Sequence, residues 1–458
     1  MPKSKLLLGF TVANKYYDYG QIGDITRSND GLSDITVNNM QINNLCGATN
    51  VHSFVDAEGE LRVLAAQYTQ NAGDSPLAAI IKLYNPATNP WSPAGAMTWP
   101  AINTLHDAVA AGSYIHTIDH DSGTIASHNM TGTACSEAGI IKFPAYFNAI
   151  EGPGRPPLAP AGLQHNGVAL LKAGQFLLAL FTTVDDPGGT AVYQASTVVK
   201  LRIDPTTGAL SYTAGDYVKV GKNALALEPF AFTFNNTVYN NIYIPCLGGP
   251  QHFGSHNPDS RLDIVNLSAM TARTVFQAGL ANGPSDQFDF RDLVIGNRGD
   301  VYILTGNCNA DYATFRGQVY KTTAAVLQMQ SNFAVTPALL SQLAEAVDVM
   351  TDAPGFFWAL LYENALPAIN DRFWFVRGNQ IDIYSPPPAS RNDTPCRTLT
   401  PATDLGLVNI DAVTPLWEPP LTRSIPYRGA RTPVAQARLA RQAAAAAGKA
   451  RCELRKGL

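Results

Sequence analysis

Polar pairs that contain histidine stand before apolar stretches in the first half of the chain. They are His52-Ser53, His106-Asp107 and His165-Asn166, and Glu228-Pro229 continues the pattern. Neutral imidazoles bind Zn, Mn, Fe or Cu well, and a carboxylate beside them completes a mixed set of ligands. If folding brings equivalent positions together, the three histidines and Glu228 form a candidate transition-metal site.

The second members of such pairs are mostly carboxylates or amides. Along the whole chain they include Asp107, Asn166, Asp292, Asp348 and Asp411. A ring of these oxygens around a pore would suit Ca²⁺, which takes roughly six to eight oxygen ligands. Polar residues at repeated positions also bond to neighbouring backbone and cap turns, and the sequence favours this structural role for both sets. A divalent metal (Ca, Zn, Mn or Fe) is the alternative, and the sequence by itself identifies no cofactor.

A glycine-rich segment, residues 246–261, is a second candidate. It contains His252, His256 and Asp259. On a helix, two histidines four residues apart would share one face, but the surrounding glycines and a proline make a helix unfavourable. The segment is therefore predicted to be a long surface loop, and loops of this kind often carry binding sites. An ordinary solvated loop is the competing interpretation.

A third group consists of His116, Asp119, His120 and Asp121. The spacing resembles a set of metal ligands, but the segment is typical of a strand that runs into the turn Asp121-Ser122-Gly123. Alternate side chains of a strand point to opposite faces, so a strand does not gather all four groups. The sequence predicts turn capping here.

The elements that must position these residues repeat along the chain. Seven polar pairs, with second members at positions 53, 107, 166, 229, 292, 348 and 411, recur at intervals of 54–63 residues. Strand-like runs follow most of them. The second strands are expected at 61–68, 113–119, 175–182, 238–245, 300–306 and 355–362, and the third at 79–85, 124–130, 197–204, 261–267, 317–323 and 379–385. Short strands repeated at a fixed period indicate a radial or solenoid architecture.

In this repeat the chain resembles the β-propeller superfamily over roughly residues 5–418. The resemblance implies an all-β, seven-bladed propeller. The last pair lacks downstream strands, whereas strand-like runs at 6–13, 16–25 and 33–39 precede the first pair. We therefore expect strands from both chain ends to complete one blade and close the ring. No fingerprint of a particular propeller family is present, and a β-sandwich or a parallel β-helix is the competing fold.

The C-terminal part differs in charge from the rest. Residues 420–458 contain nine Lys or Arg against Glu453 alone, a net charge of +8, and the whole chain carries −4, so the remainder carries −12. We expect a propeller domain over 1–419 and a basic linker and Ala/Arg-rich helical tail over 420–458. The arginines expected to dock this tail on a partner are Arg431, Arg438, Arg441, Arg451 and Arg455.

These features favour a non-enzymatic binding or assembly protein that presents propeller loops and whose tail docks on a partner protein or on a neighbouring copy. A metal-dependent lyase, hydrolase or oxygenase with a histidine-lined axial site is the first alternative. A lectin-like propeller that binds glycans or another small molecule is the second. Nucleic acid is disfavoured because the body is acidic. No apolar run reaches the ~20 residues of a membrane span, and the N-terminus lacks a signal-peptide pattern, so we expect a soluble protein, cytoplasmic or part of a virion or surface assembly.

Overall fold

The computed structural model describes most of the chain up to Pro415. The described residues are 5–13, 19–27, 35–46, 51–55, 60–67, 80–88, 90–98, 105–111, 113–131, 134–185, 191–234, 237–250, 257–278, 289–296, 299–308, 314–324, 326–327, 345–349, 353–354, 358–363, 371–401 and 409–415. The predicted helical tail with its five arginines, and the loop residues His252 and His256, lie outside these ranges.

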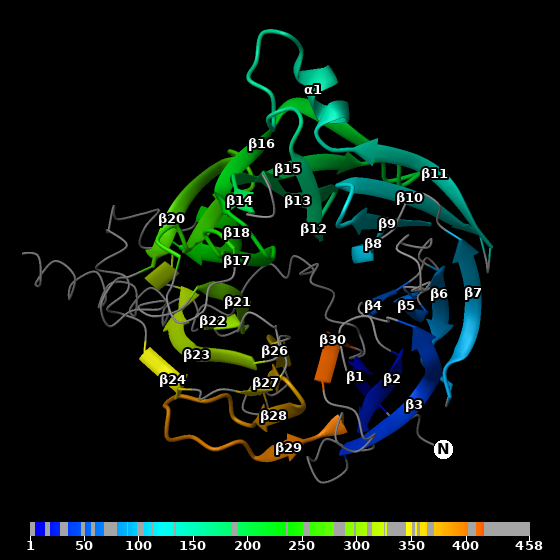
Figure 1. The fold of residues 1–458 in the computed structure, drawn as a ribbon, viewed down its shortest axis with the longest axis vertical. Helices are drawn as coiled ribbons and strands as arrows, with labels where there is room; N and C mark the ends of the chain where they lie inside the picture. The colour runs from blue at the N-terminus through cyan, green and yellow to red at the C-terminus, as the bar shows by residue number, and fades with distance from the viewer. Residues whose placement is uncertain are drawn as a thin grey trace, which may run out of the picture.

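The described strands form seven antiparallel sheets arranged around a common centre (Figure 1). We name each sheet by the strand nearest the centre. The β30 sheet contains β30 (Asn409–Pro415), β1 (Lys5–Ala13), β2 (Tyr19–Arg27) and β3 (Ile35–Cys46). The β4 sheet contains β4 (Val51–Val55), β5 (Leu61–Gln67), β6 (Ile80–Asn85) and β7 (Ser92–Thr98). The β8 sheet contains β8 (Leu105–Ala111), β9 (Tyr114–Asp119), β10 (Thr124–Thr131) and β11 (Ala134–Lys142).

The remaining sheets follow the same order from the centre outward. The β12 sheet contains β12 (Gln164–Ala173), β13 (Phe176–Asp185), β15 (Ala195–Ile203) and β16 (Leu210–Lys222), with β14 (Val192–Tyr193) beside β13. The β17 sheet contains β17 (Glu228–Phe234), β18 (Thr237–Cys246), β19 (Arg261–Asn266) and β20 (Thr271–Gln277). The β21 sheet contains β21 (Phe290–Ile295), β22 (Asp300–Cys308), β23 (Thr314–Thr323) and β24 (Glu345–Val349), with β25 (Ala353–Pro354) beside β23. The β26 sheet contains β26 (Trp358–Glu363), β27 (Arg372–Arg377), β28 (Gln380–Tyr384) and β29 (Arg397–Leu399).

Strands from the two ends of the described chain share one sheet. β30 pairs antiparallel with β1, with Leu8 opposite Pro415 and Ala13 opposite Asn409. β30 also contacts β4, the innermost strand of the next sheet. The last described strand therefore lies between the first strand and the β4 sheet.

One predicted pair, Val347-Asp348, is wrongly placed by the sequence pattern. It lies in β24, the outermost strand of the β21 sheet, and the next innermost strand is β26, which starts at Trp358. The run 355–362, predicted to be a second strand, thus contains an innermost strand. Inner and outer strands show the same alternation of apolar residues, so only strand pairing distinguishes them.

The apolar core lies between neighbouring sheets. One cluster combines Tyr243 and Val275 of the β17 sheet with Phe290 and Val301 of the β21 sheet, all fully buried. Similar clusters join the β8 and β12 sheets, the β12 and β17 sheets, the β21 and β26 sheets, the β26 and β30 sheets, and the β30 and β4 sheets. Each of these interfaces buries apolar surface that a single sheet would leave in water, which stabilises the radial stack.

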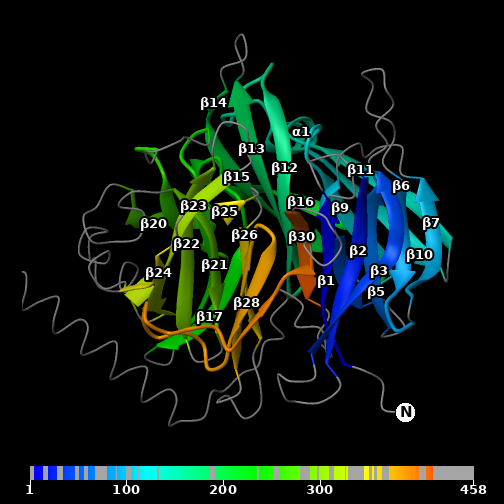
Figure 2. The same ribbon diagram turned by 60° about the horizontal axis from the view of Figure 1, so that its bottom comes forward.

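One short helix, α1 (Ala145–Glu151), follows the β8 sheet and lies beside β11 and β16 (Figure 2). Its last residue, Glu151, is buried and accepts hydrogen bonds from the Tyr212 hydroxyl, from Gly215 N at 2.7 Å and from Arg155 Nη1 at 2.9 Å. Burial opposes ionisation of this carboxyl, but the three donors outweigh it and the pKa of Glu151 is lowered. The helix is therefore anchored to β16 through a carboxylate.

We predict that Glu151→Gln lowers the free energy of unfolding by about 2–4 kcal/mol, because hydrogen bonds to a charged, buried group are among the strongest. Chemical denaturation measures this effect. Arg155→Ala is the control, since the Arg155 side chain is half exposed and its pair with Glu151 should contribute far less. Equal losses in the two variants would contradict the proposed anchor.

None of the helices that the structure describes is long and apolar enough to cross a membrane.

Candidate functional site at the centre of the β8 and β12 sheets

The three predicted histidines occupy matching places in the chain trace. His52, His106 and His165 are each the second residue of an innermost strand, in β4, β8 and β12. β8 contacts both β4 and β12, so the three strands adjoin one another. Their side chains, however, have different surroundings.

His106 is held against the next sheet by its own backbone geometry. Leu105 pairs with Asp119 and Asp107 with Ile118, so His106 is the extra residue of a β-bulge. Val168 is likewise the extra residue in β12, between the pairs of Gly167 and Ala169. The imidazole Nδ1 of His106 lies 2.5 Å from the carbonyl oxygen of Val168. One hydrogen bond therefore joins the bulge residues of the adjoining strands β8 and β12.

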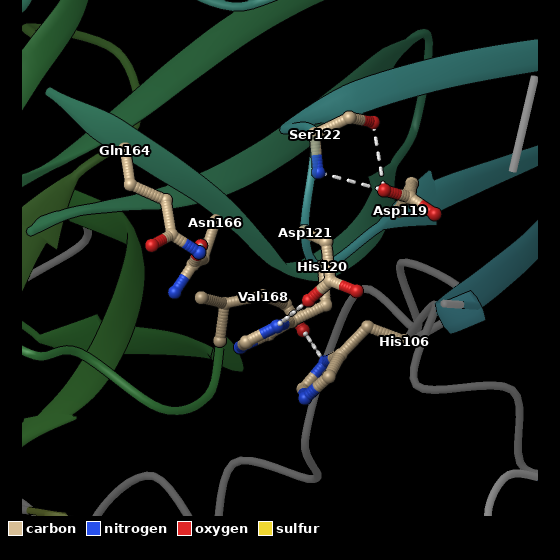
Figure 3. A network of polar contacts seen from close by, with 8 residues as sticks. All are labelled: His106, Asp119, His120, Asp121, Ser122, Gln164, Asn166 and Val168. Carbon is tan, nitrogen blue, oxygen red and sulfur yellow. Dashed lines mark hydrogen bonds and ion pairs between the residues drawn. The ribbon is translucent and has the colours of Figure 1, made fainter. Parts of the chain in front are cut away.

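A second imidazole, that of His120, lies beside His106. Its ring centroid is 5.2 Å from that of His106, and the ring planes differ by 27°, which is a stacked arrangement (Figure 3). His120 Nδ1 lies 3.0 Å from Asp121 Oδ1. The turn that carries His120 is capped by Asp119, whose Oδ1 accepts from Ser122 N at 2.8 Å and from Ser122 Oγ at 2.7 Å. This capping role of Asp119 confirms the prediction for the turn.

Two amide side chains from the start of β12 complete the group. Gln164 Nε2 donates to Asn166 Oδ1 at 3.0 Å, and Figure 3 shows both amides on the side of the His120 ring. Gln164 is exposed, whereas Asn166 is only 7% exposed. We call His106, His120, Gln164 and Asn166 the axial histidine site.

The hydrogen bonds fix the tautomers of the two imidazoles. A carbonyl oxygen can only accept, so Nδ1 of His106 carries the proton, and the carboxylate of Asp121 assigns the same tautomer to His120. Burial, and then the neighbouring His120, lower the pKa of His106 to about 4. At neutral pH the His106 ring is uncharged, and its Nε2 is a lone-pair acceptor. Within the described part of the chain, neither Nε2 atom of these two rings has a hydrogen-bond partner.

Asp107 binds backbone across the sheet boundary. Its Oδ1 accepts from Ala108 N and its Oδ2 from Leu170 N in β12, both at 2.8 Å. His52 Nδ1 lies 3.3 Å from the same Oδ1. The carboxylate thus ties β4, β8 and β12 together, which is the structural role that the sequence favoured.

Asp292 repeats this arrangement at a different boundary. Its Oδ1 accepts from Leu293 N at 2.9 Å, and its Oδ2 accepts from Leu360 N in β26 at 3.0 Å. Like Asp107, it follows the extra residue of a bulge, here Arg291. We call Asp107 and Asp292, with their backbone partners, the inter-sheet clamps.

The three-histidine metal site is not assembled. The His165 ring packs edge-on against Phe143, with centroids 5.3 Å apart, and its Nδ1 lies 3.2 Å from Thr183 Oγ1. Burial and then Lys219 lower the pKa of His165. The bulge residue of β12 is Val168, and the bulge residue of β8 is His106. The position equivalent to His106 is therefore Val168, three residues after the His165 that the sequence repeat had aligned with it. The residues present therefore do not fit the predicted transition-metal site, and no three His, Cys, Asp or Glu among the described residues are grouped so that they could hold a metal ion.

The other predicted residues are dispersed. Glu228 begins β17, and Asp411 lies in β30. Asp348 does not belong to an axial ring, because β24 is an outer strand. In the predicted loop, Asp259 is exposed and pairs with Lys222 at 2.6 Å, while Asn257 fixes the loop base through bonds of 2.6 Å to both oxygens of Asp289.

Sequence reasoning named His120 but assigned it to turn capping, and it missed Gln164 as a site residue. A signal for His120 was present, because a tight hairpin after Ala111 places the preceding residue, Asp119, opposite Leu105 at the start of β8. Gln164 carried no such signal, since its role depends on the bulge at Val168.

Comparisons with known proteins bear on the fold. No known protein family matches the sequence, and no curated protein is detectably similar to it. Among solved structures, the chain is similar to a putative 6-phosphogluconolactonase from Bacteroides fragilis, with a TM-score of 0.50 and 11% identity over 90% of this chain and 98% of that one. The fold is a β-propeller.

Two further structures show weaker likeness to this propeller. A functionally unknown protein from Desulfotomaculum acetoxidans has a TM-score of 0.42 and 11% identity, over 82% of this chain and 92% of that one. The β-propeller domain of Nup133 from Vanderwaltozyma polyspora has a TM-score of 0.40 and 9% identity, over 85% and 90%. At such identities the likeness concerns the fold alone, because one fold hosts many functions.

Proposed function

We propose that this protein is a non-enzymatic binding propeller and that its ligand is held at the axial histidine site. The observation that carries the proposal is the stacked pair of His106 and His120. Each ring is fixed through Nδ1, so each Nε2 keeps a set orientation before any ligand arrives. Preorganised polar groups of this kind lower the cost of ordering on binding.

We also infer that each of the seven sheets is one blade of a closed seven-bladed ring. The pairing of β30 with β1 and the contact of β30 with β4 support this inference. A closed ring leaves only short, protected strand edges and gives the innermost strands β8 and β12 a fixed relative position. The axial histidine site depends on that position because its members come from both sheets.

The binding proposal predicts that small polar probes perturb the two stacked histidines. In protein labelled with ¹³C at histidine Cε1, we expect the signals of His106 and His120 to shift when a probe binds, while the signal of His165 stays in place. The probes are methyl β-D-glucopyranoside, acetate and methylammonium, which are neutral, anionic and cationic. His106→Phe and His120→Phe assign the signals. If no probe moves either signal, the axial histidine site is not a binding site.

The assembly role of the tail rests on charge. Residues 420–458 carry +8 against −12 in the rest of the chain, and we propose that the tail docks on a partner protein or a neighbouring copy through Arg431, Arg438, Arg441, Arg451 and Arg455. Single exposed ion pairs contribute only ~0–1 kcal/mol, so several must act together.

We predict that full-length protein sediments as a larger species than a variant truncated at residue 419, and that the difference shrinks at high salt because screening shortens the range of surface charges. Analytical ultracentrifugation at low and high salt measures this. If the full chain is monomeric but the tail recovers a protein in a pull-down and releases it at high salt, the tail docks on a partner protein and not on a second copy. Identical behaviour of both forms in both assays would contradict docking.

An enzyme is the second candidate, and the pair of His120 with Asp121 favours it. A carboxylate that orients an imidazole through Nδ1 leaves Nε2 as a general base. This alternative predicts a compound that is consumed by the wild-type protein and is bound but unchanged by His120→Gln. A ligand recovered intact from both proteins would leave binding as the function.

A further inference from the structure

We propose that the axial histidine site binds a neutral polyhydroxyl ligand, a sugar or polyol, through neighbouring hydroxyl groups. The inference rests on the proposed binding function and adds the chemical class of the ligand. It follows from the hydrogen-bonding groups that the site presents and from the partners that the nearby carboxylates already have.

The site offers acceptors and donors side by side. Nε2 of His106 and Nε2 of His120 are acceptors, because both rings carry their proton on Nδ1. Gln164 Nε2 donates to Asn166 Oδ1, so the Gln164 carbonyl remains an acceptor and the Asn166 amide nitrogen remains a donor. A hydroxyl group can donate and accept at once, so two adjacent hydroxyls match an imidazole and an amide together.

The charged groups nearby are already engaged. Both oxygens of Asp107 accept backbone N–H groups, and Asp121 binds His120. His106 is neutral at pH 7 because burial and then His120 lower its pKa to about 4. An anion would face two lone pairs with no compensating positive charge. An ammonium ion would satisfy the acceptors but would make no use of the amide donor of Asn166.

The four residues of the site differ in their exposure to solvent. Gln164 is exposed, His106 and His120 are partly buried, and Asn166 is 7% exposed. A ligand that enters past Gln164 would therefore meet the imidazoles before it reaches the buried amide. Because the two rings come from β8 and from the β9–β10 turn of one sheet, while both amides come from β12 of the next sheet, the ligand would bridge two sheets.

The test titrates full-length protein, labelled at histidine Cε1, with the same three probes. We expect methyl β-D-glucopyranoside to shift the His106 and His120 signals with saturation, and acetate and methylammonium to leave them in place. Shifts caused only by acetate or methylammonium would overturn the polyhydroxyl class while keeping the binding site. If none of the three probes shifts either signal, the binding function itself is overturned. Failure of the ligand class and failure of the binding function are therefore distinguishable.

Variants of the amide side chains test their role in binding and leave both imidazoles in place. Gln164→Ala should weaken binding of the glucoside about 3- to 10-fold, the loss expected for one neutral hydrogen bond. Gln175→Ala, an exposed glutamine at the opposite end of the same hairpin, is the matched control and should not change the affinity. Equal affinity of Gln164→Ala and the wild type, at an unchanged melting temperature, would overturn the assigned role of the amides.

Discussion

The free energy of unfolding is expected to fall steeply as the pH is lowered from 6.5 to 4. Two histidines of the β8 sheet, His116 and His128, are 0% and 2% exposed. Burial lowers the pKa of each to about 4 from the ordinary 6.5. Between these values the unfolded chain binds protons that the folded chain does not, so stability present above pH 6.5 is lost as the pH approaches 4. Each histidine accounts for up to about 3 kcal/mol, since one pKa unit corresponds to about 1.4 kcal/mol.

This effect is large against a typical total stability of about 5–15 kcal/mol. Between pH 6.5 and about 5 the unfolded carboxyl groups, with pKa values of about 3.9–4.3, are still largely ionised, so histidines dominate this part of the window. Urea denaturation at half-unit pH steps measures the slope. We expect His128→Gln to flatten this slope by the share of one residue. A wild-type stability that is flat from pH 6.5 to 4 would contradict the neutral, buried state of His116 and His128.

The sequence could predict the architecture because that depends on repetition. Strand-like runs at a near-constant period indicate a radial fold, and five of the six predicted second strands correspond to β5, β9, β13, β18 and β22. Side-chain direction was much harder to predict, because a single extra residue in a strand reverses which face the following side chains take. Bulges at His106, Val168 and Arg291 leave no mark in the sequence, and they decide that His106 meets the β12 sheet whereas His165 turns to Phe143.

The same bulges explain why the polar pairs predicted the role of some residues and not of others. At His106-Asp107 and Arg291-Asp292 the first residue of the predicted pair is the bulge residue, and the aspartate accepts a hydrogen bond from the next sheet. Where the alignment slips by three residues, as at His165-Asn166, the pair takes other roles. Residue type therefore indicated the aspartates as structural, but only the strand register shows which of them act as clamps.

Removing an inter-sheet clamp is expected to destabilise the whole propeller. Asp292→Ala should lower the free energy of unfolding by about 2–4 kcal/mol, because it removes two hydrogen bonds to a carboxylate and leaves the Leu360 N–H at the sheet boundary without its acceptor. Asp107→Ala should cost a similar amount through the Leu170 N–H, and it also removes one partner of His52.

The two clamps lie at different sheet boundaries, so the losses in the double variant should add to within about 0.5 kcal/mol. Asp204→Ala is the matched control: Asp204 accepts two backbone N–H bonds of 2.8 Å, but in an exposed turn inside one sheet, where water can replace it. We expect a much smaller loss there. Because apolar clusters join neighbouring sheets, each clamp variant should still unfold in a single transition, with a lower midpoint in urea. A separate early transition would mean that one sheet detaches alone, and losses no larger than that of Asp204→Ala would mean that Asp107 and Asp292 do not tie the sheets together.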